Sequence, residues 1–253
     1  MADKRKRVVI KLGSGILTRP SRDGLHVGQF RRFVAEVAEV IQAGTDCVLV
    51  TSGAVAAGMM ALHLSERPRD LPSIQACAAI GQSRLMRLYG TLFSRHGLGV
   101  AQLLLTHQDI DSRTRYQNAR NTLEQLFRFG KVVPIINEND SVAVEELKFG
   151  ENDLLSAEVA LLSRADLLIL LTSVEGLLDD SGRVIECVTD LAAVSRFATK
   201  ETGVYSTGGM VSKLEAASLA TSAGVPVVVA SGLRPGVLDQ VLQGVAVGTR
   251  FCV

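Results

Sequence analysis

Residues 132–153 read VVPIINENDSVAVEELKFGEND, and this stretch decides both the fold class and the place of the site. It begins with the apolar run VVPII, which is typical of a buried strand. The run ends in NEND (residues 137–140), and a second polar group, END (residues 151–153), follows after a loop. In open α/β sheets, ligands bind at the carboxyl ends of the strands. We therefore predict that both polar groups line a binding site at this edge of a sheet.

The rest of the chain alternates between strand-like and helix-like segments. Uninterrupted apolar runs predict strands that are buried on both faces. These runs cover residues 8–12, 47–51, 100–105, 132–136, 167–171 and 225–230. Apolar residues at helical spacing predict helices at residues 27–43, 74–96, 113–129, 154–162, 211–223 and 235–242. This alternation predicts an α/β protein with a parallel sheet covered on both faces.

Residues 173–200 interrupt the alternation. They contain the turn sequence DDSG at residues 179–182, and we interpret the segment as a hairpin insertion in the C-terminal half. No linker or internal repeat divides the chain. We expect two lobes that meet somewhere between residues 150 and 173.

The composition argues against several classes of protein. Lys and Arg number 27 and Asp and Glu 26, and this net charge of +1 argues against a surface that coats nucleic acid. No apolar run is long enough to span a bilayer and no signal peptide opens the chain, so we expect a cytosolic protein that binds no membrane. Cys47, Cys77, Cys187 and Cys252 lack CxxC spacing and are expected to be core residues in a reducing compartment. The four histidines are assigned to no site, and the metal ligands stay unknown.

Lys11 lies at the end of the first predicted strand, just before Gly13-Ser14-Gly15. A lysine inside an apolar strand needs an anion to offset the cost of its burial, and a Gly/Ser loop can present backbone N–H groups to phosphate oxygens. The loop is neither a Walker A motif nor a complete GxGxxG fingerprint, which disfavours a nicotinamide-binding fold. Taken alone, Lys11 could equally be a strand-end lysine whose ammonium group reaches solvent.

Two further loops are candidates for anion binding. The first, SGA at residues 52–54, follows the second strand and can offer N–H groups and a hydroxyl to a carboxylate or phosphate, but no GxSxG elbow makes Ser52 a nucleophile. The second, TGGMVSK at residues 207–213, leads into a helix and puts Lys213 near its first turn. A lysine there opposes the helix dipole but suits a phosphoryl group. Each loop, taken alone, could be an ordinary turn before a helix.

Two lysines at element ends, glycine-rich loops and an Asp/Asn cluster, without a P-loop, indicate phosphoryl transfer by positioning and charge. In this order, the segments VVIKLGSGIL, VTSGAVAAG, AAIGQSRL, VPIINENDSVA, FGENDLLSA and TGGMVSKL resemble the amino-acid kinase family. The resemblance covers essentially the whole chain, and the NEND and END pair is its most specific part.

The resemblance implies a fold, an activity and partners. The fold is a three-layer αβα sandwich with a mostly parallel sheet of about eight strands, a substrate lobe over about residues 1–165 and a nucleotide lobe over about residues 166–253. The activity is the ATP- and Mg²⁺-dependent phosphorylation of the γ-carboxylate of L-glutamate to γ-glutamyl phosphate, the first step of proline biosynthesis. Members of the family form dimers or tetramers, and inhibition by proline is usual among them.

The resemblance also implies roles for individual residues. Lys11 and Lys213 would contact the transferring phosphoryl group, and Asp153 would hold both lysines in place. The implied substrate-binding residues are Ser52, Gly53, Ala54, Asn137, Asp140 and Asn152. The implied nucleotide-binding residues are Lys11, Thr172, Ser173, Thr207, Gly208, Gly209, Met210, Val211, Ser212 and Lys213. On the substrate, Asp140 is predicted to pair with the ammonium group, and the two asparagines to donate to the α-carboxylate.

This chain departs from the family pattern in places. Many members have Asp where it has Ser173 and Glu151, and many continue into a C-terminal PUA-type module that is not predicted here. Two other functions stay open, a kinase of another amino acid or small carboxylate and a catalytically silent sensor of glutamate, proline or nucleotide. The presence of both lysines and Asp153 argues against the sensor, because binding alone does not require two lysines on the transferred group.

Overall fold

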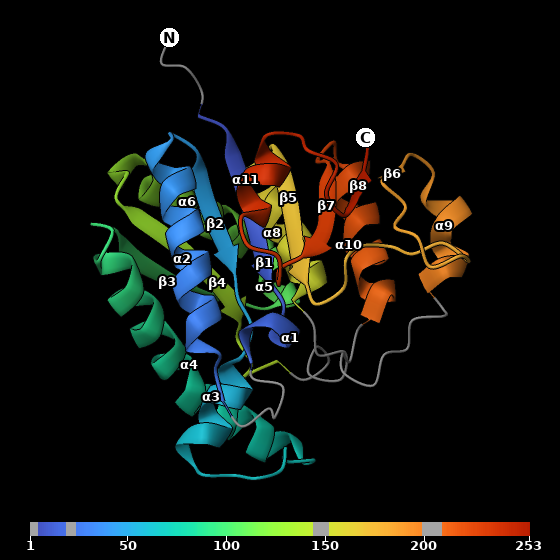
Figure 1. Cartoon of the computed structure of the whole chain (residues 1–253). Coiled ribbons are helices and arrows are strands. Elements are labelled where there is room, and N and C mark those ends of the chain that lie inside the picture. The colour runs from blue at the N-terminus through green and yellow to red at the C-terminus, as the bar shows by residue number, and fades with distance from the viewer. Residues whose placement is uncertain (1–4, 19–23, 144–151, 199–208) are drawn as a thin grey trace.

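The computed structural model describes residues 5–18, 24–143, 152–198 and 209–253 (Figure 1). The strands are β1 (Arg7–Leu12), β2 (Asp46–Val50), β3 (Gly99–Leu105), β4 (Val132–Glu138), β5 (Leu167–Thr172), β6 (Cys187–Val188), β7 (Val227–Ser231) and β8 (Thr249–Phe251). The helices are α1 (Ser14–Leu17), α2 (Val27–Gln42), α3 (Ala54–Ala61), α4 (Leu71–Ser94), α5 (His107–Asp111), α6 (Arg113–Phe129), α8 (Asp153–Ser163), α9 (Leu191–Ala198), α10 (Gly209–Ser222) and α11 (Val237–Leu242).

The described strands form one eight-stranded sheet in the order β3-β4-β2-β1-β5-β7-β8-β6. The pairs from β3 across to β7 are parallel, β8 is antiparallel to β7, and β6 is parallel to β8. Strand β1 lies at the centre, where Lys11 aligns with Val50 of β2 and Leu170 of β5. The predicted α/β class, with a mostly parallel sheet of eight strands, is confirmed.

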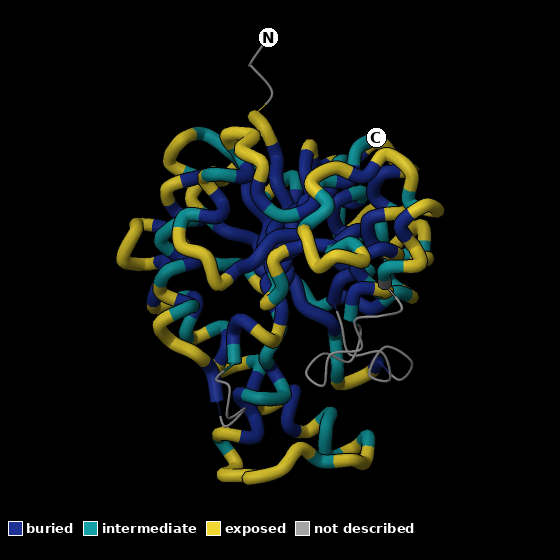
Figure 2. The backbone as a smooth tube through the Cα atoms, turned by 45° about the vertical axis from the view of Figure 1, so that its right-hand side comes forward, coloured by how far each residue is buried: buried dark blue, intermediate teal, exposed yellow. Residues whose placement is uncertain are grey.

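Helices cover both faces of the sheet and complete a three-layer sandwich. Helices α2, α4 and α11 pack on one face, and α6, α8 and α10 pack on the other. Alternate side chains of the central strand enter different cores, so that Ile10 packs on the α2 side and Val9 on the α8 side. Figure 2 shows the buried residues, in dark blue, gathered in the centre of the molecule. Burial on both faces explains why the strand sequences are uninterrupted apolar runs.

The predicted helices and strands are present, and most of their ends shift by a few residues. The helix predicted at residues 113–129 matches α6 at both ends. Helix α4 begins earlier than predicted, at Leu71, because Asp70 caps it by accepting a hydrogen bond from the Ser73 N–H at 2.9 Å. The patterns do not predict α1, α3 or α5. Helix α3, AVAAGMMA, is apolar or small on every side and therefore has no amphipathic period.

The hairpin predicted within residues 173–200 is only partly correct. A tight turn does join Leu178 to Val184 through an antiparallel bridge. The segment then enters the sheet as β6 and continues into α9. Strand β6 pairs with β8, and the sequence patterns do not predict β8 either. Strands of two and three residues are too short to show a period.

The prediction that all four cysteines lie in the core is wrong for two of them. Cys47 and Cys77 are buried, but Cys187 is exposed and Cys252 is partly exposed. Strand β6 is the last in the sheet, and Cys187 points away from the core while its neighbour Val188 points into it.

No helix within the described residues has the length and the apolar character needed to cross a bilayer.

Candidate functional site

Three buried charged side chains meet where β1 ends. The Nζ atom of Lys11 lies 2.6 Å from Oδ1 of Asp153, and the Nζ atom of Lys213 lies 3.1 Å from Oδ2 of the same carboxylate. Asp153 is fully buried, and Lys11 and Lys213 are only 3% and 5% exposed. One carboxylate therefore bridges two ammonium groups.

Three elements bring these charges together. Lys11 is near the carboxyl end of β1, Asp153 is the first residue of α8, and Lys213 lies at the end of the first turn of α10. The amino end of a helix favours Asp153 and disfavours Lys213. Lys213 is compensated by Asp153 and by the carbonyl oxygen of Gly209, 3.0 Å from its Nζ atom. Ser212 adds a hydrogen bond from its hydroxyl to Oδ2 of Asp153 at 2.8 Å.

The charge of this cluster determines what it can bind. The two lysines bring two ammonium groups, and Asp153 one carboxylate, to a buried place. Ammonium groups form charge-assisted hydrogen bonds with phosphate oxygens, so the cluster is suited to a polyanion such as the phosphates of a nucleotide.

The loop after β1 packs against the end of β5. The Gly13 N–H donates to the Leu171 carbonyl at 3.0 Å. A Cβ atom on Gly13 would lie 3.2 Å from that carbonyl oxygen, and one on Gly15 would lie 3.3 Å from the Ser173 hydroxyl. The glycines therefore allow the loop to lie close to Thr172, which is partly buried, and to Ser173, which is exposed.

The other residues predicted to bind nucleotide differ in their surroundings. Met210 is buried in the core on the α8 side of the sheet, so its side chain packs there and does not line a site. Val211 is 47% exposed, and Gly209 and Ser212 are partly buried. Thr207 and Gly208, and Glu151 on the substrate side, lie outside the described residues.

Asn152 and Asn137 are joined beside the charged cluster. The Nδ2 atom of Asn152 donates to the Thr51 carbonyl at 2.6 Å and to Oδ1 of Asn137 at 2.7 Å. Both N–H groups of this amide are thus directed at protein acceptors, and Asn152 can meet a ligand only as an acceptor, through Oδ1. This geometry replaces the donor role that the sequence suggests for Asn152.

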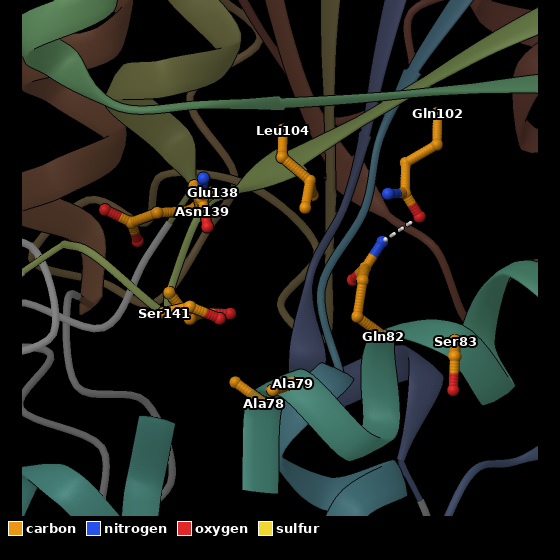
Figure 3. Close-up of a pocket in the computed structure, with 10 residues that line it drawn as sticks. Ala78, Ala79, Gln82, Ser83, Gln102, Leu104, Glu138, Asn139 and Ser141 are labelled. Carbon is orange, nitrogen blue, oxygen red and sulfur yellow. Dashed lines mark hydrogen bonds between the residues drawn. The ribbon is translucent and has the colours of Figure 1, made fainter. Parts of the chain in front are cut away.

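Two glutamines extend the hydrogen-bonded pair of Asn152 and Asn137 away from the charged cluster. The Nδ2 atom of Asn137 donates to Oε1 of Gln82 at 2.8 Å, and Nε2 of Gln82 donates to Oε1 of Gln102 at 3.1 Å. Figure 3 shows Gln82 of α4 and Gln102 of β3 pointing toward each other. Four side-chain amides therefore form one chain in which each donates to the next. Sequence reasoning missed both glutamines, because a single Gln in a helix or strand carries no pattern.

The turn after β2 brings backbone donors to the same edge. Gly53 has φ +101° and precedes α3, whose first residue is the buried Ala54. A left-handed conformation of this kind favours glycine. The N-cap residue of α3 is this glycine, which has no side chain to cap the first N–H groups of the helix. Behind the turn, the buried hydroxyls of Thr51 and Tyr89 share a hydrogen bond of 2.8 Å.

Asp140 lies two residues beyond β4 and lines an open hollow of about 260 Å³ together with Gln82, Gln102 and Glu138 (Figure 3). Burial raises the pKa of Asp140 to about 6, and the positive charge of Arg67 offsets this only in part. Gln82 lines the hollow and also binds Asn137, so the hollow adjoins the amide chain.

Mg²⁺ in phosphoryl-transfer sites is usually bound through one or two carboxylates together with substrate phosphates and water. No three His, Cys, Asp or Glu side chains among the described residues gather closely enough to hold a metal ion. Both oxygens of Asp153, the carboxylate at the centre of the cluster, already face lysines.

Comparison with known proteins identifies the family. The model of the amino acid kinase family matches residues 6–231. This chain belongs to the amino acid kinase family. A relative from Moorella thermoacetica, named glutamate 5-kinase, is 49% identical to this chain over 97% of the chain's length. The chain spans 66% of the length of that relative.

Two further comparisons extend this result. A glutamate 5-kinase from Symbiobacterium thermophilum is 44% identical over 97% of this chain and 95% of its own length. A solved structure of UMP kinase from Bacillus anthracis superimposes with a TM-score of 0.65 over 98% of this chain and 96% of its own. At 18% identity, that likeness shows a shared fold only. This amino acid kinase is therefore similar in sequence to the glutamate 5-kinases and similar in fold to a nucleotide kinase.

Proposed function

We propose that this chain transfers the γ-phosphoryl group of ATP to the γ-carboxylate of L-glutamate, which gives γ-glutamyl phosphate and ADP at the start of proline biosynthesis. The observation that carries the proposal is the fully buried Asp153 with a lysine on each oxygen, in a chain 44–49% identical to glutamate 5-kinases. Family membership makes ATP the co-substrate.

Lys11 and Lys213 would act on the transferring phosphoryl group. Negative charge on its equatorial oxygens must be stabilised as the bond to ADP breaks, and buried ammonium groups held in position need no reorganisation to do so. Asp153 fixes their separation. The nucleophile is a carboxylate, which is already ionised at neutral pH, and the reaction therefore requires no general base.

The amide and carboxylate groups would bind the amino-acid end of glutamate. Asp140 and Oδ1 of Asn152 are acceptors suited to the ammonium group, while Asn137 has one further N–H for the α-carboxylate. The turn at Ser52-Gly53-Ala54, with the N–H groups that open α3, would hold the carboxylate that receives the phosphoryl group.

The nucleotide would lie on the C-terminal side of the cluster, along residues 172–173 and 207–213. We propose the same division for the lobes, with substrate bound by about residues 1–165 and nucleotide by about residues 166–253. Mg²⁺, which lowers the charge on the phosphates, would enter as its complex with ATP, because in phosphoryl-transfer sites it is usually bound through substrate phosphates and one or two carboxylates. A cytoplasmic location follows from this use of ATP.

We further propose that copies of the chain associate as a dimer or tetramer and that proline inhibits the enzyme. Apolar side chains that are partly exposed on α3 and the segment after it, Met60, Leu62 and Leu64, offer a surface for association. Sedimentation analysis and inhibition assays with proline test these two statements separately.

The central experiment is a hydroxamate assay that traps the acyl phosphate, run with ATP, Mg²⁺ and either glutamate, aspartate or N-acetylglutamate. We expect turnover with glutamate alone, because aspartate is one methylene short of the phosphoryl group and acetylation removes the ammonium charge. Losing one preorganised donor costs roughly 10²–10³ in kcat, so Lys11→Met should be nearly inactive. The exposed Lys131 gives a matched control, Lys131→Met, which should behave as the native chain. Comparable kcat/KM for N-acetylglutamate and glutamate would contradict the proposed substrate.

A further inference from the structure

Cys187 and Cys252 form a pair of thiols at the edge of the sheet. Their Sγ atoms lie 3.3 Å apart. Cys187 is exposed and Cys252 is partly exposed, whereas Cys47 and Cys77 are buried. Neither member of the pair belongs to the phosphoryl-transfer site, so the kinase activity does not explain why two accessible thiols meet here.

Strand pairing keeps the two side chains on one face. Cys187 of β6 pairs with Arg250 of β8, and Cys252 lies two residues after Arg250. Side chains two residues apart on an extended strand point the same way. The Cys252 N–H donates to the Val188 carbonyl at 3.0 Å, which continues the pairing past the end of β8. Figure 1 shows β6 and β8 beside each other near the C-terminal end.

We propose that Cys187 and Cys252 are a redox-active pair that closes reversibly to a disulfide and ties β6 to the segment after β8. The sulfur atoms need to approach by about 1.2 Å to reach the disulfide length of about 2.05 Å. The strands that would have to shift for this approach are short, because β6 has two residues and β8 has three.

Oxidised glutathione is a suitable two-electron oxidant. The thiolate of one cysteine attacks a sulfur of oxidised glutathione, which forms a mixed disulfide and releases one glutathione thiolate. The thiolate of the other cysteine then attacks the protein sulfur of the mixed disulfide. The Cys187–Cys252 bond forms and the second glutathione leaves. Two protein thiols are oxidised, and one oxidised glutathione becomes two molecules of reduced glutathione.

The bond would enclose the part of the chain that carries Lys213. The covalent loop from residue 187 to residue 252 contains α9, α10, β7, α11 and β8. In the reduced state, β6 is attached to the last strand by backbone bonds, among them Arg250 N–H to the Glu186 carbonyl at 2.8 Å. Closing the loop restricts the unfolded chain and should stabilise this side of the molecule.

The test equilibrates the folded chain with mixtures of oxidised and reduced glutathione and follows the intact mass, the titratable thiols and a non-reducing peptide map. We expect the native chain to lose two thiols and two hydrogen atoms, with one linked peptide that joins residues 187 and 252. An excess of reduced glutathione should reverse the change. Cys187→Ser and Cys252→Ser should stop at one bound glutathione each, and Cys47 and Cys77 should stay unmodified.

Thermal unfolding gives a second readout. The oxidised native chain should unfold roughly 5–10 °C above the reduced chain, while oxidant should not raise the midpoint of Cys187→Ser. The proposal is overturned if the folded native chain keeps its thiols, accumulates only glutathione adducts, or links copies of the chain to one another.

Discussion

Asp153 is the residue on which the geometry of the site depends most directly. Each of its carboxylate oxygens faces one buried ammonium group, so its charge both orders the lysines and makes their burial tolerable. A change at this position therefore affects catalysis and stability together.

Replacing Asp153 by Asn keeps the shape of the side chain and removes its charge. We expect kcat to fall about 10²–10³-fold and the free energy of unfolding to fall by about 3–5 kcal/mol, because two buried cations lose their counter-ion. Steady-state kinetics and urea unfolding measure the two effects. The exposed Asp239 supplies a control, Asp239→Asn. Normal kcat in the folded fraction of Asp153→Asn would leave Asp153 with a structural role only.

We expect Asp140 to give glutamate binding a pH dependence. Its pKa is raised from 3.8 to about 6 by burial, so the folded chain holds this proton more tightly than the unfolded chain does. The resulting contribution to stability is present below about pH 4 and is lost as the pH rises through about 6. The ammonium group of glutamate needs the ionised form. We expect KM for glutamate to fall as the pH rises from about 5 to 7, with a midpoint near 6. If KM for glutamate depends on pH as steeply in Asp140→Asn as in the native chain, Asp140 does not bind the ammonium group.

At the scale of single elements, α3 and α4 cross at two glycines. A Cβ atom on Gly58 would lie 1.8 Å from the Cys77 carbonyl oxygen, and one on Gly81 would lie 1.8 Å from the Ala54 carbonyl oxygen. Backbone atoms occupy both places and cannot give way. The crossing holds the amino end of α3, where the Ser52-Gly53-Ala54 turn lies, against α4.

Gly81→Ala should therefore move α3 away from α4. We expect a loss of about 2–3 kcal/mol in the free energy of unfolding and a higher KM for glutamate. Gly90→Ala is the matched control in the same helix, because its Cβ atom would lie 3.7 Å from the nearest side chain. It should be neutral or stabilising by about 0.5–1 kcal/mol, since alanine is the better helix former. Equal effects of the two substitutions would contradict the close crossing.

The chain of four amides runs from Asn152, the N-cap of α8, through β4 and α4 to β3, and Gln82 of α4 is one of its two inner members. Gln82→Leu removes the acceptor for Asn137, which frees that side chain to rotate and loosens its contact with Asn152. We expect KM for glutamate to rise by roughly 5–10-fold, equivalent to about 1–1.4 kcal/mol, with a smaller change in kcat. Ser83→Ala, at the next position of the same hollow, is the control. An unchanged KM would show that the glutamines do not position the site.

The helices and strands that could be predicted are those whose burial imposes a regular pattern of apolar residues on the sequence. Strand β1 and strand β5 are buried on both faces, and α2 and α6 are amphipathic, so each of these leaves its pattern in the sequence. Helix α3 is apolar or small throughout, and β6 and β8 are very short, so tertiary contacts and not local patterns define them.

At the scale of the whole molecule, the charged cluster couples ligand binding to stability. The cluster holds two cations and one anion, so bound phosphates should stabilise the folded chain. At about 100 times its Kd, a non-hydrolysable ATP analogue should add about 2.7 kcal/mol and raise the unfolding midpoint by about 5–10 °C. Lys11→Met should lose most of this shift, and Lys131→Met should keep it. Differential scanning fluorimetry measures the shift, and a full shift in Lys11→Met would contradict the coupling.

The assembly of the site could be predicted only through the family resemblance. Lys11, Asp153 and Lys213 lie far apart in the sequence, and no spacing rule shows that β1, α8 and α10 bring them together. Of the polar groups at residues 137–140 and 151–153, Asn137, Asn152 and Asp153 lie together with Lys11 at one edge of the sheet. The direction of the Asn152 amide and the participation of Gln82 depend on side-chain geometry, which the sequence does not express.

The central place of β1 has a consequence for how the chain is made. Strand β1 pairs with β2 on one side but with β5, residues 167–172, on the other. During synthesis, at about 5–20 residues per second, β1 must therefore wait with one edge unpaired until the residues of β5 have emerged. Val8, Val9 and Ile10 are apolar and flank that open edge. The nascent chain thus carries an apolar strand with an unpaired edge until its second partner is made, and an unpaired edge of this kind favours aggregation during that interval.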